Sequence, residues 1–234
     1  MMEYAIAEEL ITRVGVKKVI LACRNLERGV AALEKLQKLA DPERQTVQLE
    51  LVDTSKIESV NDFCATILKD EERLDFLILN AGVAFPPDKE QPLADKFGNT
   101  CYVLAANYLG HFQMVEKLKS KMLKTAASLK SEIRVVSVSS GASKRATIDF
   151  EALENIAAGK EPKKPSGAYG QSKLAQIMHM KYLQKNCSIF GQLPNSKCVS
   201  ITPGFAKTDL TTNNAKSLKA QILMWTFSPI NLVF

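Results

Sequence analysis

Short apolar runs rich in β-branched residues alternate along the chain with longer segments in which apolar residues recur at helical spacing. Runs of this kind, bounded by polar residues or glycine, are typical of strands that are buried on both faces. The sequence predicts five such strands, at residues 18–22, 46–52, 74–79, 133–138 and 197–201. Their alternation with helical segments predicts a parallel sheet whose strands are connected by crossover helices.

The predicted helices lie at residues 3–13, 27–39, 55–70, 102–124 and 168–186. Asp53, Thr54 and Ser55 offer a side-chain cap for the start of the third helix. Gly15 stands where the first helix should end, at a position that favours glycine because the chain often turns left-handed there. We therefore expect an α/β, Rossmann-like fold: a doubly wound parallel sheet with helices on both faces, formed by residues 1–234 as a single domain.

Composition agrees with a globular protein, because 46% of the 234 residues are hydrophobic and 24% are charged. The formal net charge is +6, but the 31 basic residues are spread among 25 acidic ones. This distribution favours an anionic cofactor over nucleic acid, so we expect no nucleic-acid partner. Five scattered cysteines without a Cys-x-x-Cys pair, and the absence of a secretory signal at the start, predict an intracellular protein, cytoplasmic or peripheral on a membrane.

Metal and membrane signals are weak in this sequence. The two histidines, His111 and His179, have no ligand-type spacing, so we expect no metal site and interpret both as packing or surface residues. The apolar stretch at 222–234 is interrupted by polar residues and proline and is far short of a bilayer span. A peripheral membrane contact near the C-terminus stays open.

Candidate chemistry lies at the ends of predicted strands and the starts of predicted helices. The residues are Asn80, Ala81 and Gly82 after one strand, Asn107 in a helix, Ser139 and Ser140 after another strand, and Tyr169 with Lys173 in the last helix. The spacing of four between Tyr169 and Lys173 places both side chains on one face of that helix. A cation beside a phenol favours the phenolate and brings the group closer to the pH at which it can act as a base.

These residues, in this order, resemble the motifs of the short-chain dehydrogenase/reductase family. The stretches LACRN at 21–25 and GQSKLA at 170–175 resemble the retinol dehydrogenase branch, with WW-domain-containing oxidoreductase as a near neighbour. The resemblance implies that Tyr169 exchanges a proton with the substrate oxygen, while Lys173 tunes the phenol and holds the nicotinamide ribose. It implies that Ser140, or alternatively Ser139, hydrogen-bonds the same oxygen. Asn107 matches the asparagine that completes a relay to water.

Cofactor choice in a dinucleotide fold is made just after the second strand, where an acidic residue binds a ribose 2′-hydroxyl and an arginine accommodates a 2′-phosphate. Arg24 follows the run at 18–22 and no acidic residue stands there, which favours NADP(H) over NAD(H). Asp53 resembles the residue on the adenine side, but could equally be only a helix cap. The resemblance adds Asn80, Ala81, Gly82, Pro203, Gly204 and Thr208 as cofactor-binding residues.

The start of the sequence departs from the family pattern. That pattern opens with a strand and a Thr-Gly-x-x-x-Gly-x-Gly loop, whereas Met1, Met2 and Glu3 stand where the loop should end. Glycines in this loop let the backbone approach the pyrophosphate, so their absence should weaken cofactor binding. We expect a domain that is incomplete at both ends, lacking the first strand, the glycine-rich loop and the last strand.

Two functional hypotheses follow. The first is an NADP(H)-dependent oxidoreductase that interconverts a carbonyl and an alcohol on a small-molecule substrate, lipophilic by analogy with retinoids or steroids. The alternative is a catalytically silent relative that serves as an interaction or regulatory module after losing cofactor binding. Oligomeric state stays open, a homo-oligomer included.

Overall fold

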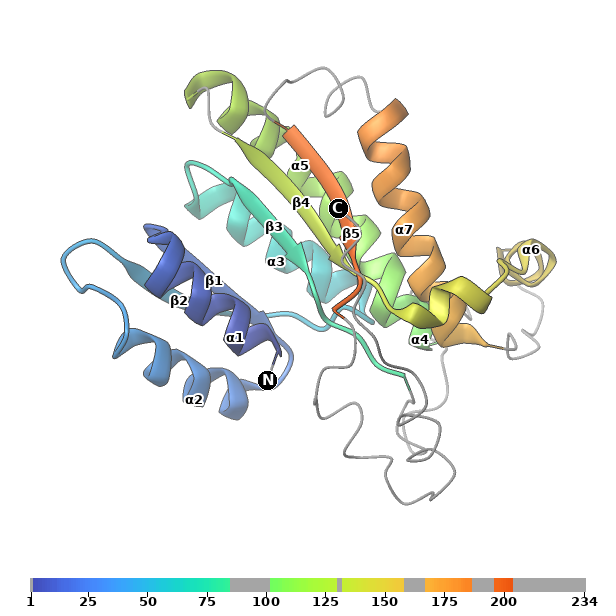
Figure 1. The fold of residues 1–234 in the computed structure, drawn as a ribbon, viewed down its shortest axis with the longest axis horizontal. Coiled ribbons are helices and arrows are strands. Elements are labelled where there is room, and N and C mark those ends of the chain that lie inside the picture. Colours follow the sequence, from blue (N-terminus) through green and yellow to red (C-terminus); the bar gives the residue numbers. More distant parts are fainter. Residues whose placement is uncertain (1, 85–101, 130–131, 158–166, 187–195, 204–234) are drawn as a thin grey trace. The chain divides into compact units, whose positions relative to one another are not determined.

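The computed structural model describes residues 2–84, 102–129, 132–157, 167–186 and 196–203 (Figure 1). The described chain falls into two compact units, the first ending at Asp53 and the second beginning at Thr54. All paired strands in both units run parallel, which confirms the predicted α/β class. Within these described ranges, no helix is both long and apolar enough to cross a membrane.

The first unit contains a two-stranded parallel sheet with helices packed against it. Its elements are α1 (Met2–Glu9), the π-helical turn η1 (Leu10–Val14), β1 (Lys18–Cys23), α2 (Leu26–Gln37) and β2 (Thr46–Leu51). The core of the unit is formed by Ala7, Ile11, Val19, Leu36 and Val47. Apolar residues from both strands and from the helical segments therefore share one buried cluster, as the hydrophobic pattern requires.

Gly15 ends the first helical segment, as predicted. Its φ of 71° is left-handed, and its N–H donates to the carbonyl of Leu10. Gln45 then holds the connection to β1, because its Nε2 donates to the carbonyls of Ile11 at 3.0 Å and Val16 at 2.9 Å. The bond to Ile11 satisfies a carbonyl that the end of a helix leaves without a partner.

The second unit contains a three-stranded parallel sheet in the order β3-β4-β5. Its elements are α3 (Ile57–Asp70), β3 (Phe76–Leu79), α4 (Tyr102–Leu104), η2 (Ala105–Leu109), α5 (Gly110–Leu129), β4 (Ile133–Val138), η3 (Gly141–Arg145), α6 (Phe150–Ala157), α7 (Ala168–Asn186) and β5 (Ser196–Ile201). α5 packs against α3, while α7 packs against β4, β5 and the η2 turn that leads into α5. Figure 1 shows this succession of helices along the sheet.

Side chains on β4 and β5 alternate between a covered and an open face. The paired residues Val135 and Cys198 are buried, whereas their neighbours Arg134 and Lys197, also paired, are not.

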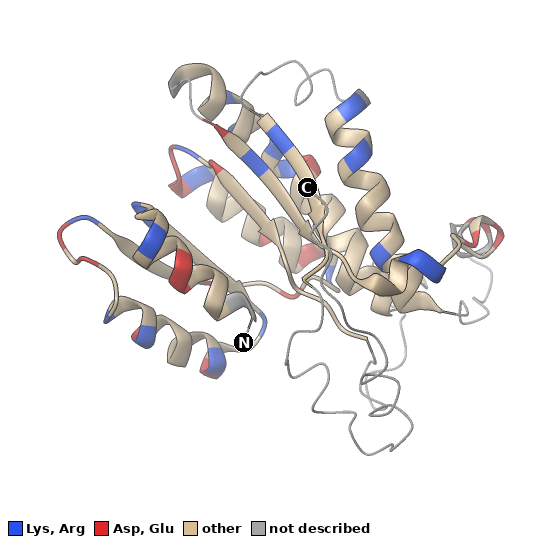
Figure 2. Ribbon diagram, viewed as in Figure 1, with Lys and Arg blue, Asp and Glu red and all other residues tan. Residues whose placement is uncertain are grey.

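Figure 2 shows basic residues spread over the elements of both units and interspersed with acidic ones. The described strands form two separate sheets, and the predicted lack of a first and a last strand stays a prediction.

The start of α3 corrects one prediction. The side-chain cap expected from Asp53, Thr54 and Ser55 was wrong, because α3 begins at Ile57 and the cap position is held by Lys56 without a side-chain cap bond. Thr54 and Ser55 form a turn of their own before the helix, and Ser55 is buried. Two short elements, η3 and α6, were not predicted from the sequence.

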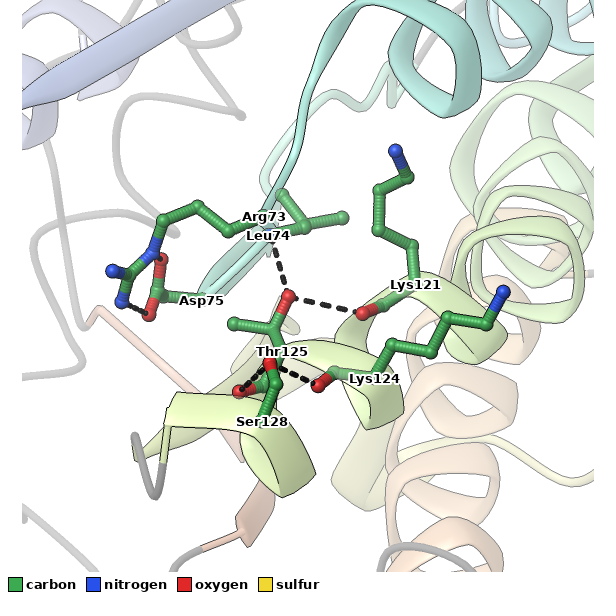
Figure 3. A network of polar contacts seen from close by, with 7 residues as sticks. All are labelled: Arg73, Leu74, Asp75, Lys121, Lys124, Thr125 and Ser128. Carbon is green, nitrogen blue, oxygen red and sulfur yellow. Dashed lines mark hydrogen bonds and ion pairs between the residues drawn. The ribbon is translucent and has the colours of Figure 1, made fainter.

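Thr125 ties α5 to the start of β3 (Figure 3). Its Oγ1 accepts a hydrogen bond from the N–H of Leu74 at 3.0 Å and donates to the carbonyl of Lys121 at 3.0 Å. The Nζ of Lys121 in turn donates to the carbonyls of Leu68 and Glu71 at the end of α3. A lysine at this position satisfies carbonyls that α3 leaves open. This network holds α3, α5 and the start of β3 together.

We expect Thr125→Val to lower the free energy of unfolding by about 1–3 kcal/mol, because it leaves the Leu74 amide without its acceptor at nearly unchanged side-chain volume. Ser128→Ala is the matched control, since the Ser128 hydroxyl on the exposed side of α5 bonds to the carbonyl of Lys124 in its own helix. The control should change stability by less than about 0.5 kcal/mol. Urea unfolding measures both, and equal losses would contradict the role of Thr125.

Candidate active site

Tyr169 and Lys173 lie one turn apart on α7. The Lys173 Nζ is 5.7 Å from the centroid of the Tyr169 ring, and donates a hydrogen bond to the carbonyl of Val138 at 2.8 Å. Lys173 is only 4% exposed, and this burial lowers its pKa to about 8. The ammonium is thus held beside the phenol in a site with little access to water.

Asn107 connects this helix to the loop that follows β3. Its Oδ1 accepts from the N–H of Val83 at 2.7 Å, and its Nδ2 donates to the carbonyl of Val83 at 2.9 Å. The same Nδ2 donates to the Ser172 Oγ at 3.0 Å, and the Ser172 hydroxyl donates to the carbonyl of Tyr169 at 2.7 Å. A single fully buried amide therefore fixes the loop, the η2 turn and α7 relative to one another.

Gly82 explains why this loop can come so close to Lys173. A Cβ added at Gly82 would lie 3.2 Å from the Lys173 Nζ and 3.3 Å from the Asn107 Oδ1. Asn80 precedes it at the carboxyl end of β3, and its Oδ1 is buried without a hydrogen-bond partner among the described residues. Ala81, between them, is half-buried. The loop thus brings the Gly82 backbone close to the buried ammonium and contains one amide oxygen without a hydrogen-bond partner among the described residues.

The two serines after β4 have different surroundings. Ser139 is buried, and its hydroxyl donates to the carbonyl of Lys173 at 2.8 Å. Ser140 is half-buried, and its Oγ accepts a bond from the N–H of Ala142 at 3.3 Å at the start of η3. Accepting that bond leaves the Ser140 hydroxyl proton for donation elsewhere. The Ser139 hydroxyl proton, in contrast, is already donated to the backbone of α7.

Gly170 allows α7 to approach η3. A Cβ at this position would lie 3.1 Å from the Cβ of Ala146 and 3.2 Å from the carbonyl oxygen of Ala142. α7 and η3 consequently pack directly against each other. The structure thereby gathers Ser140, Asn107, Tyr169 and Lys173 in the second unit, around the carboxyl ends of β3 and β4.

The expected cofactor residues are distributed differently. Arg24 is exposed in the bend after β1, where the side chain of Asn25 caps α2 by accepting a bond from the N–H of Arg28. Asp53 is half-buried after β2, so both Arg24 and Asp53 belong to the first unit. Pro203 is exposed two residues after β5. Gly204 and Thr208 lie outside the described residues.

Sequence reasoning missed two residues of this cluster. Ser172 is fully buried, and Gln176, which is 1% exposed, donates from Nε2 to the carbonyl of Asn107 at 2.7 Å. Each lies three residues after a predicted catalytic residue, a spacing that places it on nearly the same helical face. That spacing was the available signal.

Both histidines are buried in the second unit. Burial lowers the pKa of His111 to about 3 and that of His179 to about 4. The His179 ring lies 4.9 Å from the Phe112 ring, centroid to centroid. Both imidazoles are therefore neutral near pH 7 and pack within the interior, in agreement with the interpretation of them as packing residues.

Comparison with known proteins identifies the class to which this fold and cluster belong. The model of the short chain dehydrogenase family matches residues 4–152. The chain belongs to this family of oxidoreductases. Members of this family act on small-molecule substrates with a nucleotide cofactor.

Retinol dehydrogenases are among the curated relatives. The chain is 35% identical to retinol dehydrogenase 13 of Mus musculus over 207 residues, which are 87% of this chain and 55% of that protein. The human protein of the same name is 34% identical over 206 residues, with the same coverage. The chain thus spans about half the length of the curated relatives that it matches.

Solved structures share the fold. A crystal structure of an uncharacterised protein from Mycobacterium paratuberculosis aligns with a TM-score of 0.64 at 28% identity, covering 90% of this chain and 66% of that one.

Proposed function

We propose that this chain carries the proton-transfer site of an NADP(H)-dependent oxidoreductase that interconverts a carbonyl and an alcohol. The observation that carries the proposal is the buried Lys173 ammonium, held beside the Tyr169 ring by the Val138 carbonyl. A phenol held in this place beside a buried cation is positioned to exchange a proton with a substrate oxygen.

Each residue of the cluster has a separate task in this proposal. Tyr169 gives its proton to the carbonyl oxygen during reduction and takes it back during oxidation. Ser140 donates a hydrogen bond to the same oxygen and stabilises the negative charge that develops there. Asn107 holds the loop at Val83 against α7 and links the site to a relay to water. A bound nicotinamide supplies or accepts the hydride.

The loop after β3 fits a nucleotide cofactor. The buried Asn80 Oδ1 has no donor among the described residues, and an unpaired buried acceptor is unfavourable unless a bound group provides one. Gly82 leaves room beside the Lys173 Nζ, where the hydroxyl groups of a ribose would be bound. Arg24 is exposed after β1, and a guanidinium at that position suits a 2′-phosphate.

We further propose a lipophilic substrate of the retinoid type. The support is the 35% identity to a retinol dehydrogenase over 87% of this chain. Retinaldehyde is therefore the first substrate to test, with NADPH as the hydride donor.

Titration with NADPH and with NADH tests the proposal together with the role of Arg24. We expect NADPH to bind more tightly, and Arg24→Asp to weaken NADPH binding by about tenfold or more beyond any loss for NADH, because a charge-assisted bond to the 2′-phosphate is replaced by repulsion. The change in nicotinamide fluorescence on binding is the measurement.

Arg44→Asp is the control for this titration, since Arg44 lies on the exposed surface of the same unit beside Asp41. It should alter both affinities by less than about twofold, as a distant exposed charge is screened by salt. Equal losses of NADPH and NADH in Arg24→Asp would refute the 2′-phosphate assignment. Absence of saturable binding of either nucleotide at millimolar concentration would favour the catalytically silent alternative.

A further inference from the structure

Gln176 is a buried amide to which the proposed reaction assigns no task. It lies on α7, three residues after Lys173, and is 1% exposed. Its Nε2 donates to the main-chain carbonyl of Asn107 at 2.7 Å and lies 3.4 Å from the Nδ1 of His111. Its Oε1 is buried without a hydrogen-bond partner in the described part of the chain.

The carbonyl that Gln176 binds belongs to a widened helical turn. In η2 the N–H of Gly110 donates to the carbonyl of Ala105, five residues earlier, instead of the usual four. Such a turn displaces its carbonyls from the regular helical ladder, and these turns are frequent at functional sites. A donor from outside the helix therefore stabilises the turn in this geometry.

Two residues of α7 hold Asn107, one on each side of Lys173. The Ser172 hydroxyl accepts from the side-chain amide of Asn107, and the Gln176 amide donates to the main-chain carbonyl of Asn107. The Asn107 side-chain amide also accepts from the N–H of Val83 and donates to its carbonyl, in the loop where Gly82 lies close to the Lys173 Nζ. The position of that loop relative to Lys173 is consequently determined through Asn107.

The unpartnered Oε1 suggests why this residue is not apolar. Burying an amide with one open oxygen is unfavourable, and a methionine would fill a similar volume without that penalty. Stability alone therefore does not account for a glutamine at this point. The hydrogen bond to Asn107 is the feature that methionine could not supply.

We propose that Gln176 is a positioning residue, which holds the main-chain carbonyl of Asn107 and thereby sets the position of the Gly82–Val83 loop opposite Lys173. Its effect on turnover rests on the proposed function. Its effect on the surroundings of Lys173 does not, because that ammonium is buried by the chain's own residues without cofactor or substrate.

The test compares Gln176→Met with Gln113→Met in the full chain. Gln113 on α5 also donates one amide hydrogen bond, to the Asn61 Oδ1 at 3.1 Å, but does not contact Asn107 through it. For Gln176→Met we expect kcat for retinaldehyde reduction to fall by about tenfold or more, with the KM for NADPH within about threefold, because small displacements in a site mainly affect the reaction step. Gln113→Met should leave both unchanged.

The second readout needs neither cofactor nor substrate. Titration of ¹³C-labelled lysine side chains by NMR should show the pKa of Lys173 rising from about 8 toward its ordinary value in Gln176→Met, because a loosened turn admits water. Tyr169 and His111 are the titratable side chains described near Lys173, and His111 stays neutral over this range because its pKa is lowered to about 3. An unchanged Lys173 titration in Gln176→Met would overturn the proposal, even if the wild-type chain had no activity.

Gln176→Glu keeps the test decisive if the methionine variant does not fold. A protonated carboxyl can donate to the Asn107 carbonyl, whereas an ionised carboxylate cannot. At low pH, we expect the ¹³C signal of Lys173 to match that of the wild type, and kcat as well where activity is present. Both should diverge from the wild type as the pH rises through the pKa of the new carboxyl. A pH profile identical to that of the wild type would refute the positioning role.

Discussion

Replacing Tyr169 by phenylalanine is expected to lower kcat for carbonyl reduction by about a thousandfold, while the dissociation constant for NADPH stays within about threefold. The substitution removes only the phenolic hydroxyl, which is the proposed proton donor to the substrate oxygen. The aromatic ring remains, and with it the contact between the ring and the Lys173 Nζ at 5.7 Å. Cofactor binding should therefore be nearly preserved.

Tyr182→Phe is the matched control for this substitution. Tyr182 lies on the same helix but is 58% exposed, so removal of its hydroxyl should leave both kcat and NADPH affinity unchanged. Consumption of NADPH is followed by its absorbance, and binding by its fluorescence. Full activity in Tyr169→Phe would remove Tyr169 from the reaction, and a parallel loss of NADPH binding would indicate a structural role instead.

The strands and helices were predictable where the local pattern of apolar and polar residues marks them. The strand at 133–138 was predicted with its observed bounds, because a short β-branched run bounded by polar residues identifies a buried strand. The helix at 168–186 was also predicted with its observed bounds. The cap of α3 was predicted wrongly, since Thr54 and Ser55 are compatible with capping but form a separate turn. η3 is a five-residue turn directly after β4, and α6 is a helix of only eight residues that was missed although its apolar residues recur at helical spacing.

The site was predictable to the extent that its residues are close in sequence. The spacing of Tyr169 and Lys173 defines one helical face, so their proximity follows from the helix alone. The bond from Gln176 to Asn107 joins residues 69 positions apart, and depends on how α7 packs against η2. The difference between Ser139 and Ser140 likewise depends on burial, because only the structure shows that the Ser139 hydroxyl binds the backbone of α7.

Gly110 is the position at which we expect the largest change in stability. It is the first residue of α5, and a Cβ added there would lie 2.0 Å from the carbonyl oxygen of Thr54, with the Cα and carbonyl carbon of Thr54 at 3.0 Å and 2.9 Å. These are backbone atoms of the turn before α3, so no side-chain rotation can relieve the overlap. We expect Gly110→Ala to lower the free energy of unfolding by roughly 3 kcal/mol or more.

Gly141→Ala provides the control, because a Cβ at Gly141 meets nothing within 4 Å and its backbone is not left-handed. It should change stability by less than about 1 kcal/mol. Helix propensity alone predicts the opposite sign for Gly110, since alanine within a helix is favoured over glycine by about 1 kcal/mol. The sign measured by urea unfolding therefore separates the two effects. If Gly110→Ala is stabilised, α5 and the Thr54 turn are not in contact. If it is destabilised, close packing at the start of α5 outweighs helix propensity at a position three residues after Asn107.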